Sequence, residues 1–341
     1  MRIVHLVCSS NYAGVERYVQ RLALAQAGDG HDVTVLGGSP AGMEPPLRSA
    51  GVRWAPAERA APAARMLSRL RHVDVVNSHM TAADVAAAVS GIRTRVPVVS
   101  TRHFAQPRGR IGPVRIDTLL HGRIAAEIAI GQAVAATIRR PSTVVHTGVE
   151  DAPAAAPGDS RTILMAQRLQ PEKHSWLGVL AFAASGLAEQ GWRLRIAGDG
   201  PERPQLDALR RDLDVADAVE LLGFRPDVGE LLASSAVLLA TCPREGLGLT
   251  VLEAMSRAVP VVAAAAAGHL DLLDGADPLL LFRPDDEAQA AARLRALADD
   301  PSARTDLGRE LQRRQRQRFT VAAQAAETEA VYREAVARWR T

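Results

Sequence analysis

The sequence predicts an α/β protein built from two domains in tandem, each with a doubly wound parallel sheet. The chain has 341 residues, which is more than one hydrophobic core normally serves. Short β-branched runs alternate along it with helical stretches rich in Ala and Leu, the pattern of parallel βαβ units. With 47% hydrophobic and 23% charged residues, the composition is that of a folded protein and not of a disordered one.

The first half of the chain carries the first alternation. Strands are expected at Arg2–Val7, Asp32–Leu36, Val52–Trp54, Val73–Asn77, Val96–Thr101, Glu127–Ile130 and Thr143–His146. Helices are expected at Val15–Ala27, Ala63–Arg71, Ala82–Ser90, Pro113–Arg123 and Ala133–Arg139. The segments Gly37–Pro62 and Ala105–Gly112 are the least patterned and are interpreted mainly as loops.

A stretch rich in Pro and Ala, Asp151–Ser160, is interpreted as an interdomain linker. After it, strands are expected at Thr162–Ala166, Trp192–Ala197, Val219–Leu222, Val237–Ala240, Val259–Ala263 and Leu279–Phe282. Helices are expected at Ser175–Glu189, Glu202–Leu213, Val228–Ala233, Leu249–Arg257, Leu270–Leu273, Asp285–Ala298, Ala303–Arg318 and Val321–Arg338. The predicted domains are Rossmann-like units at residues 1–150 and 151–320, with a final helix, residues 321–341, that crosses back to the first domain.

Composition excludes several classes of function. Aromatic residues make up 4% of the chain and the basic residues are scattered, which argues against base-stacking platforms and nucleic-acid binding. No run approaches the roughly 18 apolar residues of a membrane span, and the apolar N-terminal run is too short for a signal peptide. The two cysteines, Cys8 and Cys242, are too few for a disulfide framework or a thiolate metal site. The expected location is the cytoplasm.

Charge is divided unevenly between the two halves. Residues 1–150 carry a net charge of +8 and residues 151–341 one of −5. A basic first half suits an anionic partner, such as lipid headgroups at the inner membrane face or a phosphorylated substrate. The alternative is a solvated Arg-rich surface. The arginines in question are Arg102, Arg108, Arg110 and Arg115, together with Arg65, Arg69 and Arg71 on an expected helix.

Ligands of doubly wound sheets bind beyond the carboxyl ends of the strands, so two such domains predict a site in the cleft between them. The loop after the first strand, Cys8–Glu16, lacks the G-x-G-x-x-G motif, which argues against a dehydrogenase. Gly14 stands where this loop becomes a helix, a place where bare backbone can approach an anion. The alternative for Gly14 is a simple turn glycine.

Lys173 is the single lysine among 41 basic residues. In a chain that otherwise uses arginine, its presence suggests a site that requires a compact point charge. Arg168 precedes it by five residues on the same loop, and the two cations would suit the oxygens of a phosphate group. The alternative is a pair of solvated loop cations.

The stretch from Thr241 to Met255 contains E-G-L-G-L-T-V-L-E-A-M. A helix is expected to open near Gly248, so that the amides of Leu249 and Thr250 point toward an anion. Glu245 precedes this helix and Glu253 lies about one turn inside it, where their carboxylates can bind sugar hydroxyls. The alternative for Glu253 is a surface glutamate on a helix.

This stretch resembles the Glu-x7-Glu signature of the retaining glycosyltransferases of family 4, which have the GT-B fold. Further stretches match in order along nearly the whole chain. They are A-G-V-E at Ala13–Glu16, V-V-S-T-R-H at Val98–His103, T-G-V-E at Thr147–Glu150, R-L-Q-P-E-K at Arg168–Lys173, I-A-G-D-G-P at Ile196–Pro201, L-L-G-F at Leu221–Phe224 and A-V-P-V-V at Ala258–Val262. The sequence departs from the family pattern at Ala13, at Gln167, at His146 with Glu150, and at Ala267–Asp271.

The resemblance implies a role for each matching residue. The implied catalytic residues are His103, Arg168, Lys173 and Glu245. The implied donor-binding residues are Gly14, Arg168, Lys173, Gly198, Gly223, Phe224, Gly248, Leu249, Thr250 and Glu253. The resemblance also implies that the first domain binds the acceptor, that the donor is a nucleotide diphosphate sugar such as a UDP- or GDP-sugar, and that no metal or other cofactor takes part.

The expected reaction is therefore transfer of a sugar to a hydroxyl acceptor with retention at the anomeric carbon. A phosphorylated or lipid-linked acceptor and a peripheral membrane contact through the basic domain are hypotheses for the charge of the first half. Two alternatives are a nucleotide-sugar epimerase with the same fold and a catalytically silent subunit that binds sugar nucleotides.

Overall fold

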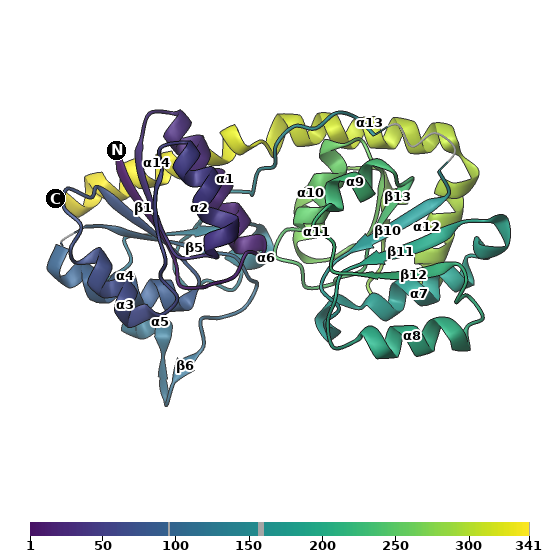
Figure 1. The fold of residues 1–341 in the computed structure, drawn as a ribbon, viewed down its shortest axis with the longest axis horizontal. Helices are drawn as coiled ribbons and strands as arrows, with labels where there is room; N and C mark the ends of the chain where they lie inside the picture. The colour runs from purple at the N-terminus through teal and green to yellow at the C-terminus, as the bar shows by residue number, and fades with distance from the viewer. Residues whose placement is uncertain (95, 156–159, 341) are drawn as a thin grey trace. The chain divides into compact units, whose positions relative to one another are not determined.

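The structure, a computed structural model, describes residues 1–94, 96–155 and 160–340 (Figure 1). The chain divides into two compact units. Unit 1 comprises Met1–Gly148 with Val321–Thr341, and unit 2 comprises Val149–Thr320. The predicted α/β class with two doubly wound parallel sheets is confirmed. Part of the predicted linker, residues 156–159, lies outside the described residues.

Unit 1 is built on a seven-stranded sheet in the order β3-β2-β1-β4-β5-β8-β9, and every pairing in it is parallel. Its strands are β1 (Arg2–Val7), β2 (Asp32–Leu36), β3 (Arg53–Ala55), β4 (Val75–His79), β5 (Val98–Arg102), β8 (Ala126–Ala129) and β9 (Thr143–Val144). The central strands are almost fully buried, as expected for a sheet with helices on both faces.

The helices of unit 1 are α1 (Gly14–Gly28), α2 (Pro40–Ser49), α3 (Ala60–Leu67), α4 (Thr81–Thr94), α5 (Ile116–Leu119), α6 (Gln132–Ala135) and α14 (Val321–Arg340). One face of the sheet packs Val4, Leu6 and Val76 against α3 and α4. The other packs Ile3, Val75 and Val99 against α14. Alternate residues of a strand point to opposite faces, so His5 lies on the same face as Ile3.

Two predictions in this half were wrong. Residues 40–49, for which the sequence predicts a loop, form helix α2, and Pro45 and Pro46 lie inside it. Residues 113–123 were expected to form one helix. Instead the chain forms an antiparallel hairpin of β6 (Arg110–Ile111) and β7 (Val114–Arg115), followed by the short α5. The hairpin replaces the start of the helix because Gly112-Pro113 suits a turn.

Unit 2 has a six-stranded parallel sheet in the order β12-β11-β10-β13-β14-β15. Its strands are β10 (Thr162–Ala166), β11 (Arg193–Ala197), β12 (Val219–Gly223), β13 (Val237–Ala240), β14 (Val261–Ala264) and β15 (Leu281–Phe282). Its α-helices are α7 (Ser175–Ala184), α8 (Arg203–Asp212), α9 (Val228–Ala233), α10 (Leu249–Ser256), α11 (Ala267–Leu273), α12 (Glu287–Asp299) and α13 (Pro301–Arg318). Short 3-10 turns lie at Pro171–Lys173, Ala188–Gln190 and Pro278–Leu280.

Helices cover both faces of this second sheet. In Figure 1, α7 and α8 lie below it, while α9, α10 and α13 lie above it. Nearly all of the predicted strands and helices of unit 2 are confirmed within a few residues at each end. Among the described residues, no helix has both the length and the apolar character that crossing a membrane requires.

Candidate functional site

The loops that follow the strands of unit 2 gather at one edge of its sheet, because the carboxyl ends of parallel strands share an edge. Residues 167–173 follow β10, and residues 241–248 follow β13. Backbone hydrogen bonds join neighbouring loops. Leu169 N donates to Asp199 O at 2.9 Å. Gly268 N donates to Glu245 O at 3.0 Å. The predicted residues of the second domain therefore meet in one cluster of loops.

The main ion pair of this cluster joins Lys173 to Glu245. Nζ of Lys173 donates to Oε2 of Glu245 at 2.5 Å, and the side chains are 14% and 26% exposed. Burial by itself lowers the pKa of Lys173, but the Glu245 carboxylate outweighs burial and raises it. Burial by itself raises the pKa of Glu245, but Lys173 outweighs it and the pKa is lowered. Both groups therefore stay charged at neutral pH.

Gln167 and Thr241 hold the backbone of Lys173 in place. Thr241 Oγ1 donates to the Lys173 carbonyl oxygen at 2.9 Å, and Gln167 Nε2 donates to the same oxygen at 3.2 Å. Gln167 Nε2 also donates to Ser175 Oγ at 2.9 Å. Sequence reasoning treated Gln167 only as a departure from a family glycine. In the structure Gln167 Nε2 also donates to Thr241 Oγ1 at 3.2 Å, so its amide ties the loop after β10 to the loop after β13.

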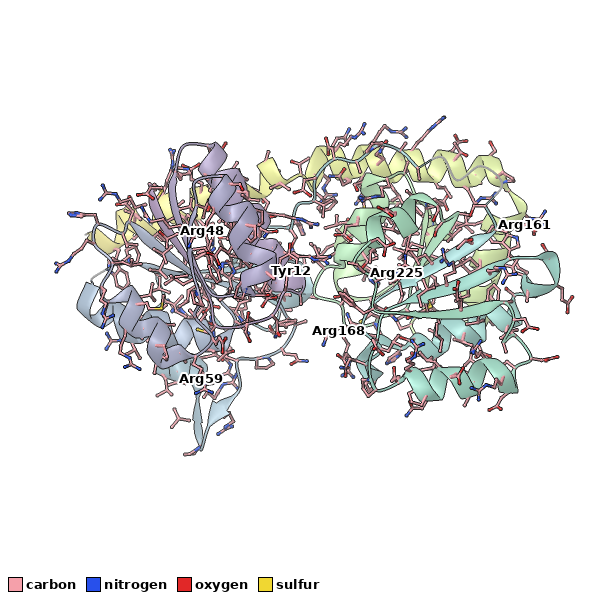
Figure 2. The ribbon with its side chains drawn as sticks, in the orientation of Figure 1. Tyr12, Arg48, Arg59, Arg161, Arg168 and Arg225 are labelled. Atoms are coloured by element: carbon pink, nitrogen blue, oxygen red, sulfur yellow. The ribbon has the colours of Figure 1, made fainter. Side chains whose placement is uncertain are left out.

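Arg168 differs from Lys173 in its surroundings. Its side chain is 64% exposed, and Nη2 lies 3.8 Å from Oε1 of Glu172, which is itself 46% exposed. Figure 2 labels Arg168 on the loop after β10. An exposed pair at this distance contributes little to stability. The Arg168 guanidinium is therefore available to an anionic ligand at small structural cost.

Two glycines permit the close approach of these loops. Gly198 has φ +146°, and a Cβ there would lie 1.8 Å from the carbonyl oxygen of Gln167. A Cβ on Gly268 would lie 2.2 Å from Cα of Leu247, so the start of α11 can contact the loop of Glu245 only if this residue is glycine. Gly198 N also donates to Gly223 O at 2.8 Å, and the next residue, Phe224, is 74% exposed.

Helix α10 begins at Leu249, after Gly248 in the left-handed region at φ +107°. The amides of its first turn have no acceptor within the helix, as the sequence predicted for Leu249 and Thr250. The Thr250 side chain is already used, because its Oγ1 donates to Ala166 O at 3.1 Å. Glu253 lies one turn inside the helix and is half-buried.

His269 is a polar residue of this cluster that sequence reasoning missed. It is 1% exposed, and Nδ1 donates to the Ala264 carbonyl oxygen at 3.0 Å. Because a carbonyl oxygen only accepts, Nε2 of His269 is left as an acceptor. Burial lowers the pKa of His269 despite the Glu245 carboxylate, so the ring is neutral. In the sequence, the signal for a buried histidine was its position in the mainly apolar stretch between Ala264 and Leu272.

In unit 1, Gly14 is the exposed first residue of α1. Oε2 of Glu16 accepts from Ala13 N at 2.9 Å, and Oε1 of Glu16 accepts from Ser9 Oγ at 2.5 Å. A carboxylate therefore already caps the first turn of this helix. An anion that approached Gly14 would share the turn with the negative charge of Glu16.

His103 follows strand β5 and is 7% exposed. Nε2 of His103 lies 3.0 Å from Nδ1 of His79, and the Tyr18 ring meets the His103 ring edge-on at 4.7 Å between centroids. Burial and, to a smaller extent, the charge of Arg102 lower the pKa of His103 to about 3. The ring is therefore neutral at neutral pH.

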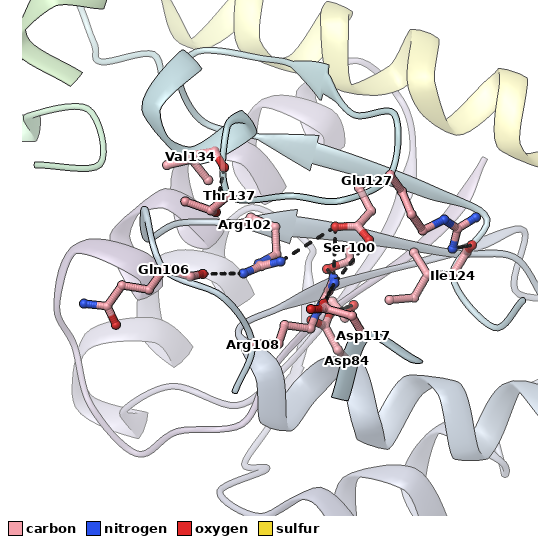
Figure 3. Close-up of polar contacts among 12 residues, drawn as sticks. Asp84, Ser100, Arg102, Gln106, Arg108, Asp117, Ile124, Glu127, Val134 and Thr137 are labelled. Atoms are coloured by element: carbon pink, nitrogen blue, oxygen red, sulfur yellow. Dashed lines mark hydrogen bonds and ion pairs between the residues drawn. The ribbon is translucent and has the colours of Figure 1, made fainter. Parts of the chain in front are cut away.

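The prediction that Arg102, Arg108, Arg110 and Arg115 form a cluster that can face an anionic partner was wrong for two of the four. Arg102 and Arg108 are buried and bind oxygens of the protein itself. Arg108 is buried against Asp84, Asp117 and Glu127, with contacts of 2.7, 3.0 and 3.1 Å (Figure 3). Arg102 is also buried: Nη2 donates to the Gln106 carbonyl oxygen at 2.7 Å, and Nη1 lies 3.8 Å from Glu127. We call Arg102, Arg108, Asp84, Asp117 and Glu127 the Arg108 cluster. Its arginines neutralise the protein's own carboxylates.

The structure thus brings Arg168, Lys173 and Glu245 together in unit 2, whereas His103 and Gly14 belong to unit 1. Within residues 1–94, 96–155 and 160–340, no group of three or more His, Cys, Asp or Glu side chains is arranged to hold a metal ion.

Comparison with known proteins shows the family of this chain. The family described as Glycosyltransferase Family 4 matches residues 12–152, and the one described as Glycosyl transferases group 1 matches residues 149–314. The chain is 31% identical over 317 residues to a D-inositol 3-phosphate glycosyltransferase of Kineococcus radiotolerans, spanning 78% of this chain and 72% of that protein. The chain belongs to glycosyltransferase family 4.

Other known proteins resemble part of this chain or its fold. An exopolysaccharide phosphotransferase of Streptomyces coelicolor is 36% identical over 143 residues, which are 41% of this chain and 15% of that protein. The crystal structure of Anabaena HepE in complex with UDP-glucose has a TM-score of 0.78 at 21% identity, covering 97% of this chain and 100% of that one. This likeness shows the GT-B fold, with its two Rossmann-like domains.

Proposed function

We propose that this family 4 protein transfers a sugar from a nucleotide diphosphate sugar, a UDP- or GDP-sugar, to a hydroxyl acceptor with retention and without a metal ion. The observation that carries the proposal is the Lys173–Glu245 ion pair, held at the carboxyl edge of a doubly wound sheet. The name of the HepE complex with UDP-glucose supports this donor class.

In the proposal, the ion pair supplies a cation for the diphosphate, Lys173, and a carboxylate for the sugar hydroxyls, Glu245. Breaking the bond between sugar and diphosphate puts negative charge on the leaving group, and fixed cations stabilise that charge. In the proposal, Lys173, Arg168 and the first amides of α10 hold the diphosphate, and Gly14 approaches it. Glu245 binds the sugar hydroxyls, and Glu253 binds the ribose. Gly198, Gly223 and Phe224 flank the base.

Retention follows if the acceptor attacks from the face that the diphosphate leaves. A phosphate oxygen then takes the proton of the acceptor hydroxyl, so that no side chain has to act as a nucleophile. His103 is the residue of unit 1 that we propose to contact the substrate sugar. Its neutral ring suits a hydrogen bond to a hydroxyl better than a contact with the diphosphate.

The acceptor is proposed to bind unit 1 and to be phosphorylated or lipid-linked. The name of the Kineococcus relative gives that protein a phosphorylated inositol acceptor, which supports the first choice. Arg102 and Arg108 are buried and paired with carboxylates of unit 1. An anionic acceptor or membrane would therefore have to bind exposed cations such as Arg65, Arg69 and Arg71. Equal binding to anionic and neutral vesicles would end the membrane hypothesis.

Ligand-induced thermal shift tests the donor first. We expect UDP or GDP to raise the melting temperature and ADP to do so less, because a ligand stabilises the folded state that binds it. Incubation of the matching sugar nucleotide with and without candidate acceptors then separates the alternatives. Epimerisation without acceptor indicates the epimerase, and binding without turnover of any acceptor indicates a silent subunit. Activity that persists in EDTA is expected, and its loss would contradict a metal-independent reaction.

A further inference from the structure

Three histidines on neighbouring strands of unit 1 form a continuous chain of contacts that ends on helix α1. Nε2 of His103 lies 3.0 Å from Nδ1 of His79. Nε2 of His79 lies 3.2 Å from Nδ1 of His5. Nε2 of His5 lies 2.7 Å from Oε1 of Gln26. We call Gln26, His5, His79 and His103 the histidine relay.

The relay lies on one face of the sheet and is enclosed by helices. His5 is in β1, His79 ends β4 and His103 follows β5, three strands that are adjacent in the sheet. His5, His79 and Gln26 are at most 1% exposed, and His103 is 7% exposed. Tyr18 of α1 stacks edge-on against the rings of His79 and His103. The relay therefore has one partly open end, at His103.

The contacts define which nitrogen of each ring carries the proton. A neutral imidazole has one N–H donor and one bare acceptor nitrogen. Oε1 of Gln26 only accepts, so His5 donates from Nε2 and its Nδ1 is bare. His79 must then donate from Nε2 to His5, and His103 must donate from Nε2 to His79. Nδ1 of His103 is left as a bare acceptor, and within the described residues it has no hydrogen-bond partner.

The rings are neutral, as this assignment requires. Burial lowers the pKa of His5 to about 4 and, together with the neighbouring histidines, places the pKa of His79 well below its ordinary value. A protonated ring would place two N–H donors against each other along the relay. The chain of single donors and acceptors is therefore the state at neutral pH.

We propose that Gln26, His5 and His79 are positioning residues that hold His103 in the tautomer whose Nδ1 accepts a hydrogen bond from a hydroxyl group of the substrate. The inference rests on the proposed function only in its last step, the identity of the substrate as a sugar. The relay makes His103 selective, because a bare nitrogen accepts from a hydroxyl and gives nothing to a group without a proton to donate.

Nitrogen NMR of the full-length protein labelled at histidine tests the relay itself. At neutral pH we expect His5, His79 and His103 in the Nε2–H form, with scalar couplings across the two contacts between rings. Loss of single resonances in His→Gln variants assigns them. An Nδ1–H form or an imidazolium at His103 would overturn the proposal, and this readout does not depend on transferase activity.

Variants of Gln26 test the effect on catalysis. Gln26→Met removes the acceptor at the end of the relay, and we expect a mixture of tautomers at His103 and a loss of about tenfold in kcat, the worth of one hydrogen bond. Gln26→Glu keeps an acceptor oxygen and should restore the Nε2–H form and most of the activity. Gln20→Met, a buried glutamine on the same helix that bonds the Gly42 carbonyl oxygen outside the relay, is the matched control.

A panel of monodeoxy donor sugars completes the test. The wild-type enzyme should discriminate against one member of the panel, and that discrimination should shrink in Gln26→Met but not in Gln20→Met. If Gln26→Met shifts the His103 tautomer and leaves kcat and this discrimination unchanged, the relay is structural and the positioning role is wrong. If no sugar nucleotide is turned over by the wild type, the proposed function fails while the tautomer measurement still stands.

Discussion

The two units each hold a cluster of cations and carboxylates, and the clusters differ in depth and in the number of partners. Arg108 of unit 1 has a side chain 1% exposed and three carboxylate partners, with Ser100 Oγ as a further acceptor at 2.8 Å. Lys173 of unit 2 is 14% exposed and has one carboxylate partner among the described residues, Glu245. Arg108 is thus saturated by the protein, whereas Lys173 keeps donors for another molecule.

This difference teaches how to separate a structural cation from one that serves a ligand. Guanidinium has five N–H donors in a fixed fork, and Arg108 uses them on oxygens of buried Asp84, Ser100 and Glu127 and of partly buried Asp117. Burial by itself lowers the pKa of Arg108, but Asp84 and Glu127 outweigh it and raise it. Breaking such a set leaves buried charge without compensation, whereas the Lys173–Glu245 pair is 14% and 26% exposed, so breaking it leaves a group that water can partly reach.

The largest expected effect is on the stability of unit 1. Arg108→Met should lower the free energy of unfolding by about 3–5 kcal/mol, because Asp84 would remain buried without its cation and Glu127 would keep only Arg102, at 3.8 Å. Urea unfolding measures it. Arg110→Met is the control, since Arg110 is exposed and donates only to a backbone carbonyl within the described residues. An equal loss in both variants would contradict a structural role for the Arg108 cluster.

The second effect is on turnover in unit 2. Lys173→Ala should lower kcat by roughly 10²–10³-fold, the usual cost of one preorganised donor at a developing negative charge. The unfolding free energy should fall by less than in Arg108→Met, because Glu245 is more exposed than the carboxylates of the Arg108 cluster that stay buried, Asp84 and Glu127. Arg283→Ala, an exposed cation of the same unit, should leave both quantities unchanged. Near-normal turnover without Lys173 would contradict the site.

The third prediction concerns how stability depends on pH, and it compares the buried histidine relay of unit 1 with the charged clusters. His5 and His103 have pKa values lowered to about 4 and about 3. They therefore contribute stability above pH 6.5 that is lost as the pH falls, because only the unfolded chain takes up protons there. As the pH falls from 6.5 to 5, the slope should rise from about 0.7 toward about 1.4 kcal/mol per pH unit for each such histidine. His5→Gln should flatten this slope in urea unfolding, and an unchanged slope would contradict it.

The smallest effect is expected at Arg168. Arg168→Ala should lower kcat/KM by about tenfold, since an exposed cation is partly screened by water and salt. The unfolding free energy should not change. Arg168→Lys should recover part of the activity, because a point charge replaces part of the guanidinium fork. A loss as large as that of Lys173→Ala would show that the two cations act as one unit.

Much of the site in unit 2 could be predicted because its signals are local. The single lysine, the glutamate before a helix start and the glycines at strand ends are each visible in a short stretch of sequence. The edge at which they meet follows from the parallel order of the strands. Gln167 could not be assigned in this way, because its partner Thr241 comes from another loop. The carbonyl partner of His269 is only five residues away, at Ala264, but its burial depends on the loop of Glu245 and Gly248, which packs against the start of α11.

The sequence by itself determined the two parallel sheets, because the alternation of β-branched and Ala-rich runs depends on neighbouring residues. Only the tertiary structure decided which arginines are buried against carboxylates of the protein and which stay exposed to solvent. Arg108 and Arg110 look alike in sequence, yet packing of α4 and β8 brings carboxylates to the first and not to the second. His5 and His79 are 74 residues apart, and sheet register alone places their rings in contact. Charge pairing and tautomer choice act across space, so they are decided where strands and helices pack together.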